Sequence, residues 1–192
     1  MRERNIPAIF IPQEFLDSWD RETFGLVEYD DKVIDSYSLS QESKYFLIKA
    51  GLPESASPFL TFESSLNGGG VKLTEKYDDA NPLYSKYIYV GFTGNGHPIC
   101  IDELNDEVIY IDYDNENEEV FINSSITQFT ESLLVYVDFI EKIKAENGRR
   151  AFLERKATNA SIEWVANRLE EIDADSLTQG AFWKEELNNF HC

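Results

Sequence analysis

The alternation of apolar and polar positions is clearest between residues 87 and 123, where β-branched and aromatic segments are separated by turn residues. The Gly-Asn-Gly sequence at 94–96 tolerates the positive φ angles that a tight hairpin requires. The segment 87–92 is therefore predicted to fold back on 98–101. This hairpin opens an antiparallel meander around which the other elements can be placed.

The third strand of the meander is predicted after a reversal at Asn105 and Asp106. Successive side chains of a strand point to opposite faces. This alternation puts Ile109, Ile111 and Tyr113 on one face and Val108, Tyr110 and Asp112 on the other. Both faces are apolar near the middle of the meander, which predicts that helices cover at least one of them.

Helical signals flank the meander on its N-terminal side. Pro12 in a first turn, followed by an apolar stripe, predicts a short helix that Gly25 ends. Ser38 and Gln41 form a capping box that predicts a second helix, which the Gly-Leu-Pro sequence at 51–53 ends.

Two further strands are predicted between the second helix and the meander, at 57–63 and, more weakly, at 71–77. A flexible turn at 67–70 separates them, and a loop at 78–83 leads into the meander. The predicted fold class is α+β, with a mostly antiparallel sheet of about five or six strands packed against helices.

The strongest helix is predicted after the meander. Ser125 and Gln128 form its capping box, and apolar residues recur every three or four positions to about Ala145. Three more helices follow: a short one around Phe152 and Leu153, a longer one with Ile162, Val165, Leu169 and Ile172, and a last one with Trp183, Leu187 and Phe190. We expect these C-terminal helices to dock on the core through Trp164 or Val165, Leu169, Trp183 and Leu187.

A chain of 192 residues with 42% hydrophobic content predicts one domain with a packed core. We place the core at about 12–145 and a C-terminal helical extension at about 149–190. The two cysteines provide no disulfide framework, and neither a signal peptide nor a membrane span is recognisable, so a reducing cytoplasm is predicted.

The charge is strongly negative, with 36 acidic against 17 basic residues and a formal net charge of −19. Such a chain repels nucleic acid and anionic membranes and favours a basic protein partner. No lysine or arginine lies between Lys86 and Lys142. The acidic residues of the meander are therefore predicted to form one negative partner-binding surface: Asp102, Glu103, Asp106, Glu107, Asp112, Asp114, Glu116, Glu118 and Glu119. Asp112, Asp114, Glu116 and Glu118 are expected to contribute most, because they alternate along one strand end.

A metal or cofactor site is not predicted. His97 and Cys100 point to opposite faces of a strand, and adjacent His191 and Cys192 are poorly placed as zinc ligands. The segment from Asp112 begins like a calcium loop, but asparagines stand at its glycine position and at its bidentate glutamate position, which excludes an EF-hand. Weak calcium binding by the acidic turn stays open.

Other catalytic patterns are equally weak. The glycines of the first hairpin are followed by a strand and not by a helix, so they form no phosphate loop. Two histidines and no nucleophile elbow give no support to a hydrolase triad, so no catalytic residue is assigned.

Several short motifs are similar to those of the SUKH superfamily, and most to its fourth group. They are the Gly-Leu-Pro helix stop at 51–53, the hairpin at 89–102, the strand at 108–112, the junction at 123–129 and Ala181-Phe182-Trp183. The resemblance implies an α+β protein in which Gly91, Asp102 and Phe129 hold fold-defining positions. It also implies an immunity protein that protects bacteria against polymorphic toxins, many of them nucleases, and carries no catalytic residue.

The resemblance, the charge and the missing catalytic set lead to one hypothesis: a non-enzymatic cytoplasmic immunity protein that binds a basic toxin. Two alternatives stay open. The SUKH superfamily includes fungal cell-wall regulators, so an intracellular scaffold or regulator of the same fold is possible, and an enzyme that uses paired carboxylates with a divalent metal is the other.

Overall fold

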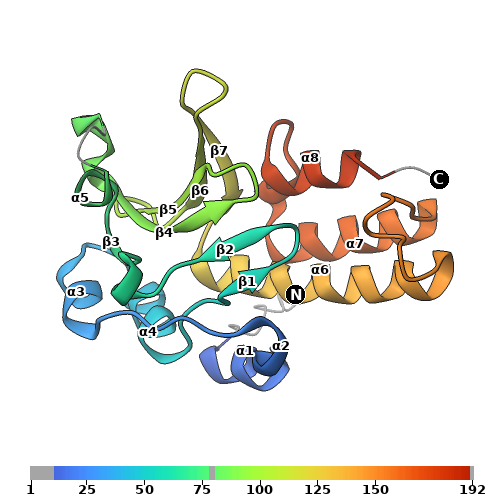
Figure 1. The fold of residues 1–192 in the computed structure, drawn as a ribbon, viewed down its shortest axis with the longest axis horizontal. Coiled ribbons are helices and arrows are strands. Elements are labelled where there is room, and N and C mark those ends of the chain that lie inside the picture. Colours follow the sequence, from blue (N-terminus) through green and yellow to red (C-terminus); the bar gives the residue numbers. More distant parts are fainter. Residues whose placement is uncertain (1–10, 78–80, 191–192) are drawn as a thin grey trace, which may run out of the picture.

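The computed structural model describes residues 11–77 and 81–190, in which helices pack mainly against one side of a sheet (Figure 1). Within these ranges the sheet has seven strands in the order β1-β2-β4-β5-β6-β7, with β3 beside β4, and every pair is antiparallel. The strands are β1 (Ser55–Ala56), β2 (Leu60–Phe62), β3 (Val71–Lys72), β4 (Tyr87–Thr93), β5 (Pro98–Asp102), β6 (Val108–Asp112) and β7 (Glu118–Asn123). The predicted antiparallel meander is confirmed.

The α-helices are α1 (Pro12–Ser18), α2 (Arg21–Phe24), α3 (Asp31–Ser36), α4 (Gln41–Lys49), α5 (Leu73–Lys76), α6 (Ile126–Asn147), α7 (Asn159–Ile172) and α8 (Phe182–Asn188). Short 3-10 helices are η1 (Ser65–Asn67), η2 (Pro82–Lys86) and η3 (Ala174–Leu177). The α+β class is confirmed. No helix in the described part of the chain has the length and apolar character that crossing a membrane requires.

Glycine is required where β2 approaches β4. A Cβ atom at Gly91 would lie 2.1 Å from the carbonyl oxygen of Thr61, so a larger residue would force these strands apart. At the next turn Gly96 has a φ of +84°, and its amide donates to the Thr93 carbonyl at 2.8 Å. The hairpin predicted from the Gly-Asn-Gly sequence is thus present, and the backbone explains why Gly91 occupies a fold-defining position.

The two faces of the sheet carry separate apolar clusters. Val108 belongs to the main core with the helices, whereas Ile109 and Ile111 lie in a second cluster with Cys100 and the tyrosines of β4, as the alternation predicted. Three lysines beside the sheet each lie over a tyrosine ring and pair with a carboxylate. Lys76 and Lys86 lie over tyrosines of the second cluster, whereas Lys72 lies over Tyr37, which packs against the main core. These sets are Lys72 with Tyr37 and Glu103, Lys76 with Tyr89 and Glu63, and Lys86 with Tyr87 and Asp102.

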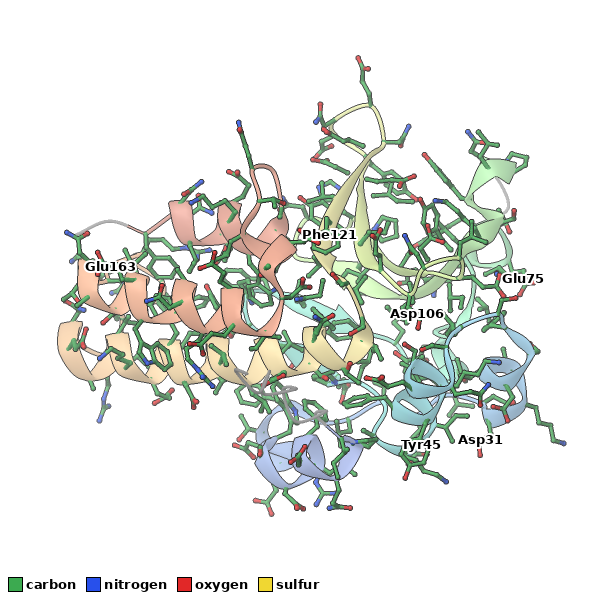
Figure 2. All side chains as sticks on the ribbon, turned by 180° about the vertical axis from the view of Figure 1, so that it is seen from behind. Asp31, Tyr45, Glu75, Asp106, Phe121 and Glu163 are labelled. Atoms are coloured by element: carbon green, nitrogen blue, oxygen red, sulfur yellow. The ribbon has the colours of Figure 1, made fainter. Side chains whose placement is uncertain are left out.

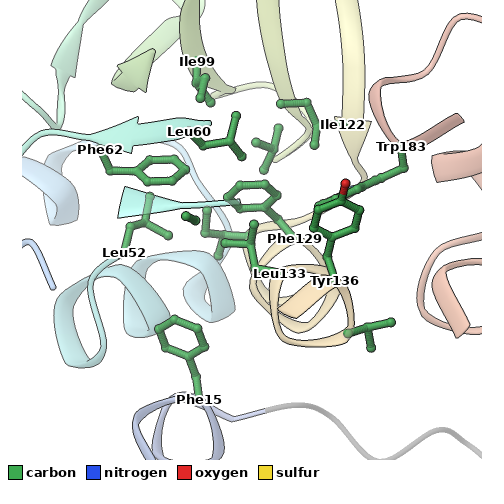
Figure 3. Close-up of a cluster of buried hydrophobic side chains, with 14 of the residues drawn as sticks. Phe15, Leu52, Leu60, Phe62, Ile99, Ile122, Phe129, Leu133, Tyr136 and Trp183 are labelled. Carbon is green, nitrogen blue, oxygen red and sulfur yellow. The ribbon is translucent and has the colours of Figure 1, made fainter. Parts of the chain in front are cut away.

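Helix α6 forms the centre of the main core. Its N-cap is Ser125, whose hydroxyl oxygen accepts from the Gln128 amide at 3.3 Å, as the capping box predicted. The apolar stripe of α6 faces the sheet, and Phe129 meets Phe62 of β2 edge to face at 5.8 Å between ring centroids (Figure 3). On its other side Tyr136 packs against Trp183 of α8, at 5.3 Å.

Several predicted elements differ near the N-terminus. The helix predicted to run to Gly25 is divided, because Asp20 accepts from the Thr23 amide at 3.2 Å and begins α2. Ser40, not Ser38, is the N-cap of α4. The backbone N–H of Ser38, which the predicted capping box would use, donates instead to the Glu103 carboxylate at 2.7 Å. Helix α3 was not predicted.

Other differences arise where tertiary packing decides the conformation. The strand predicted at 71–77 ends after Lys72 because Leu73 turns into the second cluster and begins α5. The strand predicted at 57–63 is reduced to β2, with Pro58 and Phe59 in the turn from β1. The loop predicted at 78–83 gives way to η2 from Pro82, and its residues 78–80 lie outside the described ranges.

The short helix predicted around Phe152 is also absent. The segment 149–155 instead forms successive turns that end with Arg155 at a φ of +53°. The longer helices α7 and α8 are confirmed, and they dock as expected: Val165, Leu169, Trp183 and Leu187 are buried in the main core, with Trp164 partly buried beside them.

A buried amide fastens these C-terminal helices to the sheet. Asn123, the last residue of β7, is fully buried and accepts from Trp183 Nε1 at 2.8 Å. Its Nδ2 donates to Asp173 at 3.1 Å and lies 3.3 Å from the hydroxyl of Ser132 in α6. The same Asp173 oxygen, Oδ2, also accepts from the Ser124 amide at 2.7 Å. One side chain therefore connects β7, α6, α8 and the turn before η3.

Replacing Asn123 by leucine is expected to lower the free energy of unfolding by about 3 kcal/mol, because the buried indole N–H and the Asp173 carboxylate both lose a partner. Denaturant unfolding measures this change. Asn188→Ala on the exposed side of α8 is the control and should cost no more than about 0.5 kcal/mol. Equal stabilities of the two variants would contradict the structural role of Asn123.

Candidate interaction surface

The acids of the turn between β5 and β6 are held by internal contacts. Glu103 accepts from Lys72 Nζ and from the Ser38 amide, and Asp102 accepts from Lys86 Nζ at 2.7 Å. Asp106 accepts from the Ser40 amide at 3.1 Å and from the Ser43 hydroxyl at 2.8 Å. These carboxylates fasten the turn to the loop before α4 and to the side chains of Lys72 and Lys86.

Electrostatics agree with this structural role. Partial burial by itself would raise the pKa of Glu103, but the Lys72 ammonium and the Ser38 amide outweigh it and hold that pKa below its usual range. Glu107 lies at the same turn and is half-buried, and its backbone N–H donates to the Asn105 side-chain oxygen. Figure 2 shows Asp106 at the end of the sheet that faces α4.

The acids of the β6–β7 hairpin have a different environment. Asp114, Glu116, Glu118 and Glu119 are exposed, and among the described residues no lysine or arginine forms an ion pair with them. Asp112 is half-buried at their base and accepts from the Asp114 amide at 3.0 Å. The hairpin projects from the sheet at the top of Figure 1.

The structure places the predicted acidic residues in two groups. Asp102, Glu103, Asp106 and Glu107 lie at one end of β6, and Asp112, Asp114, Glu116, Glu118 and Glu119 lie at the other. A strand of this length separates the two groups by about 15 Å. Asp102, Glu103 and Asp106 of the first group accept from lysines, amides or a hydroxyl elsewhere in the chain. The second group projects on a hairpin and has no lysine or arginine partner among the described residues, and we call it the acidic hairpin.

His97 lies at the base of the acidic hairpin. Its Nε2 is 3.4 Å from Asp112 Oδ1 and 3.7 Å from Asp114 Oδ2, and these groups are close enough together to hold a metal ion. The Nδ1 atom, however, accepts from the Tyr113 amide at 3.3 Å. The ring proton is therefore on Nε2, where a metal would have to bind, and the histidine donates toward the carboxylates instead.

The remaining predicted ligands do not join this cluster. His97 stacks on Tyr110, which packs against the main core, whereas Cys100 is fully buried in the second cluster on the opposite face. Burial raises the pKa of the Cys100 thiol well above its usual value. The predicted separation of His97 and Cys100 is confirmed, and His191 and Cys192 lie outside the described residues.

Two grooves adjoin the two acidic groups. One, of about 510 Å³, lies between the β5–β6 turn, α4 and the start of α6, where Glu42 accepts from the Thr127 hydroxyl at 3.0 Å. The other, of about 340 Å³, lies beside the acidic hairpin and includes Phe59, Tyr110 and Phe182. Sequence reasoning missed these aromatic residues as a site, because they come from distant segments and share no local pattern.

Comparison with known proteins identifies the fold family. The sequence model of the SUKH-4 immunity protein family matches residues 11–189, which is nearly the whole chain. The chain belongs to the SUKH-4 immunity protein family. Membership supports an immunity function and implies a cognate toxin as partner. No curated protein and no solved structure matches the chain.

The structural role assigned to Glu103 in this SUKH-4 chain predicts a pH-dependent stability. Because its pKa in the folded protein is below the ordinary value of 4.5, Glu103 stabilises the fold above that pH, and the contribution is lost as the pH falls through the folded pKa. Glu103→Gln is expected to cost about 1–2 kcal/mol at pH 7. The difference from the unsubstituted protein should shrink steadily below pH 4.5.

Denaturant unfolding at several pH values measures the effect, and Glu116→Gln on the exposed hairpin serves as the control. A Glu103→Gln penalty that stays constant down to pH 3, or a control variant with the same penalty, would show that the ion pair with Lys72 does not fasten the turn.

Proposed function

We propose that this chain is a non-enzymatic immunity protein that binds a basic bacterial toxin and blocks it by occlusion, with the acidic hairpin as the charged part of the contact. Family membership supports the immunity function. The observation that carries the assignment of the surface is the group of exposed carboxylates at 114–119 without matching cations.

The hairpin is built to present charge. The buried side chain of Ile111 anchors β6 where it pairs with Glu119 next to the turn. At the tip, Glu116 and Asn117 have φ angles of +53° and +61°. Asparagine tolerates this region, but a glutamate there costs stability, and a protein that needed only a turn would be better served by glycine.

A basic partner explains the concentration of acid. Like charges on one short turn repel each other, and a cationic surface would remove that repulsion on binding. Attraction between opposite charges also speeds the encounter of two proteins. A nuclease is a suitable partner because it must carry cationic groups that bind phosphate, and the hairpin carboxylates would occupy those groups.

Protection of cells tests the proposal directly. We expect the reading frame beside this gene to encode a toxin domain. That domain should arrest growth when it is expressed alone, and co-expression of the full chain should restore growth. The chain should also form a stable complex with a catalytically inactive form of that domain. Failure to protect cells that contain the folded chain would rule out the proposed function.

The acidic hairpin should control the rate of association. Changing Asp114, Glu116 and Glu118 to lysine is expected to slow binding to the inactive toxin domain by about 10-fold or more at low salt and to flatten the salt dependence. Stopped-flow mixing across a salt series measures both quantities.

The matched control carries the same change in net charge on the exposed faces of α6 and α7, in the variant Asp138→Lys, Glu163→Lys and Glu170→Lys. Equal slowing of both triple variants would mean that only total charge matters. An unchanged rate for the hairpin variant would place the recognition surface elsewhere.

A further inference from the structure

We infer that the groove beside the acidic hairpin binds an arginine side chain of the basic partner, so that recognition continues from the hairpin into a shaped aromatic and acidic site. This inference rests on the proposed function and names the partner chemistry that the groove accepts. We call it the arginine groove and define it by Phe59, Tyr110, Asp112, Arg155, Phe182 and Glu185.

The groove is formed by segments that meet only in the folded protein. The β1–β2 turn and the β4–β5 hairpin form one wall, and α8 with the turn before α7 forms the other. The volume of about 340 Å³ is within the range of about 300–1,000 Å³ that is usual for ligand sites. Its open end adjoins the base of the acidic hairpin through Asp112.

Aromatic faces line the groove. Tyr110 is stacked against His97 at 5.7 Å between ring centroids and meets Phe182 edge to face at 6.2 Å. Opposite them, Phe59 is 55% exposed although it is a large apolar side chain. Its backbone has a φ of +58°, so the fold holds an exposed phenylalanine in a strained conformation.

The packing beside Phe59 fixes this position. A Cβ atom at Gly94 would lie 3.0 Å from Cβ of Phe59, so the hairpin backbone supports the aromatic residue directly. On the other side the Phe59 ring lies 5.5 Å from that of Phe152. The Arg155 guanidinium lies 5.9 Å from the Phe59 ring centroid, so one cation already contacts this ring. Phe59 is nevertheless 55% exposed, which leaves part of its ring open to a second group.

The charge of the groove is negative. Arg155 is its single cation among the described lining residues, and it is paired with the buried Glu186, which also accepts from the Tyr136 hydroxyl. Asp112 and Glu185 are left without a lysine or arginine partner in the described structure. Burial raises the pKa of the Tyr110 hydroxyl, and the negative charges of Asp112, Glu118 and Glu185 raise it further.

This combination selects a guanidinium. Arginine has a flat face that stacks on aromatic rings and five N–H donors that match carboxylates. An apolar side chain would remove water from the carboxylates of Asp112 and Glu185 without supplying a cation, and an anion would be repelled. Arg155 already shows the same chemistry within the protein, since its guanidinium lies 5.2 Å from the rings of Phe152 and Phe190 while it pairs with Glu186.

Peptide binding tests the groove without knowledge of the toxin. The probes are hexa-arginine, hexa-lysine and hexa-citrulline peptides, capped at both ends, and amide NMR spectra of the full chain follow each titration. Hexa-arginine should shift the resonances of residues 93–97 and 182–189 as well as those of the acidic hairpin. Hexa-lysine should bind more weakly and shift mainly the hairpin, and hexa-citrulline, which keeps the shape but lacks the charge, should not bind.

Two variants separate the groove from general acidity. Phe59→Ala and Glu185→Gln should each weaken hexa-arginine binding by about 3- to 10-fold and leave hexa-lysine binding nearly unchanged. Leu66→Ala, which removes another exposed apolar side chain away from the groove, is the matched control and should change neither. The inference is overturned if both groove variants bind hexa-arginine normally, or if arginine and lysine peptides give the same affinities and the same shifts.

The same variants distinguish this inference from the proposed function. If the unsubstituted chain protects cells and both groove variants bind the inactive toxin domain with unchanged Kd, the immunity function stands and the groove assignment fails. If the unsubstituted chain gives no protection but the peptides behave as expected, the proposed function fails and the arginine specificity of the groove stands.

Discussion

The docking of the C-terminal helices on the sheet depends on the buried Asn123 amide. A carboxamide can accept from the Trp183 indole and donate to the Asp173 carboxylate at the same time. An aspartate here would repel Asp173, and an apolar residue would remove one hydrogen-bond partner from the buried indole and one from Asp173. Because Asn123 ends β7 and Trp183 lies in α8, this contact sets the distance between the hairpin and the helix that forms one wall of the arginine groove.

The meander and α6 could be predicted from sequence because local and tertiary preferences agree there. The glycines of the first hairpin, the alternation in β6 and the Ser125 cap each specify the conformation that packing also favours. Prediction failed where a distant group decided the outcome. The Ser38 amide is taken by Glu103, 65 positions away, so the cap moves to Ser40. Leu73 is drawn into the second apolar cluster, which replaces an extended segment by a helical turn.

Prediction of the acidic surface from sequence was limited in the same way, because distant residues decide which charges are paired. Consecutive turns of a meander lie at opposite ends of its strands. Acidic residues of neighbouring turns are therefore close in the sequence but separated in space. The stretch without lysine or arginine was also misleading, because Lys72 and Lys86 reach Glu103 and Asp102 from outside it. The carboxylates of the acidic hairpin have no lysine or arginine partner among the described residues. The groove next to them gave no signal in the sequence, since Phe59, Tyr110 and Glu185 are brought together by the fold alone.

The hairpin and the groove would contribute differently to recognition. Exposed charge attracts any cationic protein over several ångströms and mainly raises the rate of encounter, with little selectivity. A site that requires a flat cation between aromatic rings and carboxylates discriminates among basic partners, because a wrong side chain leaves its carboxylates desolvated. Both features stand on a rigid sheet with fixed neighbours, so little conformational entropy is lost on binding. An immunity protein needs speed and discrimination together, and adjacent placement at one end of β6 and β7 allows a single partner surface to meet both.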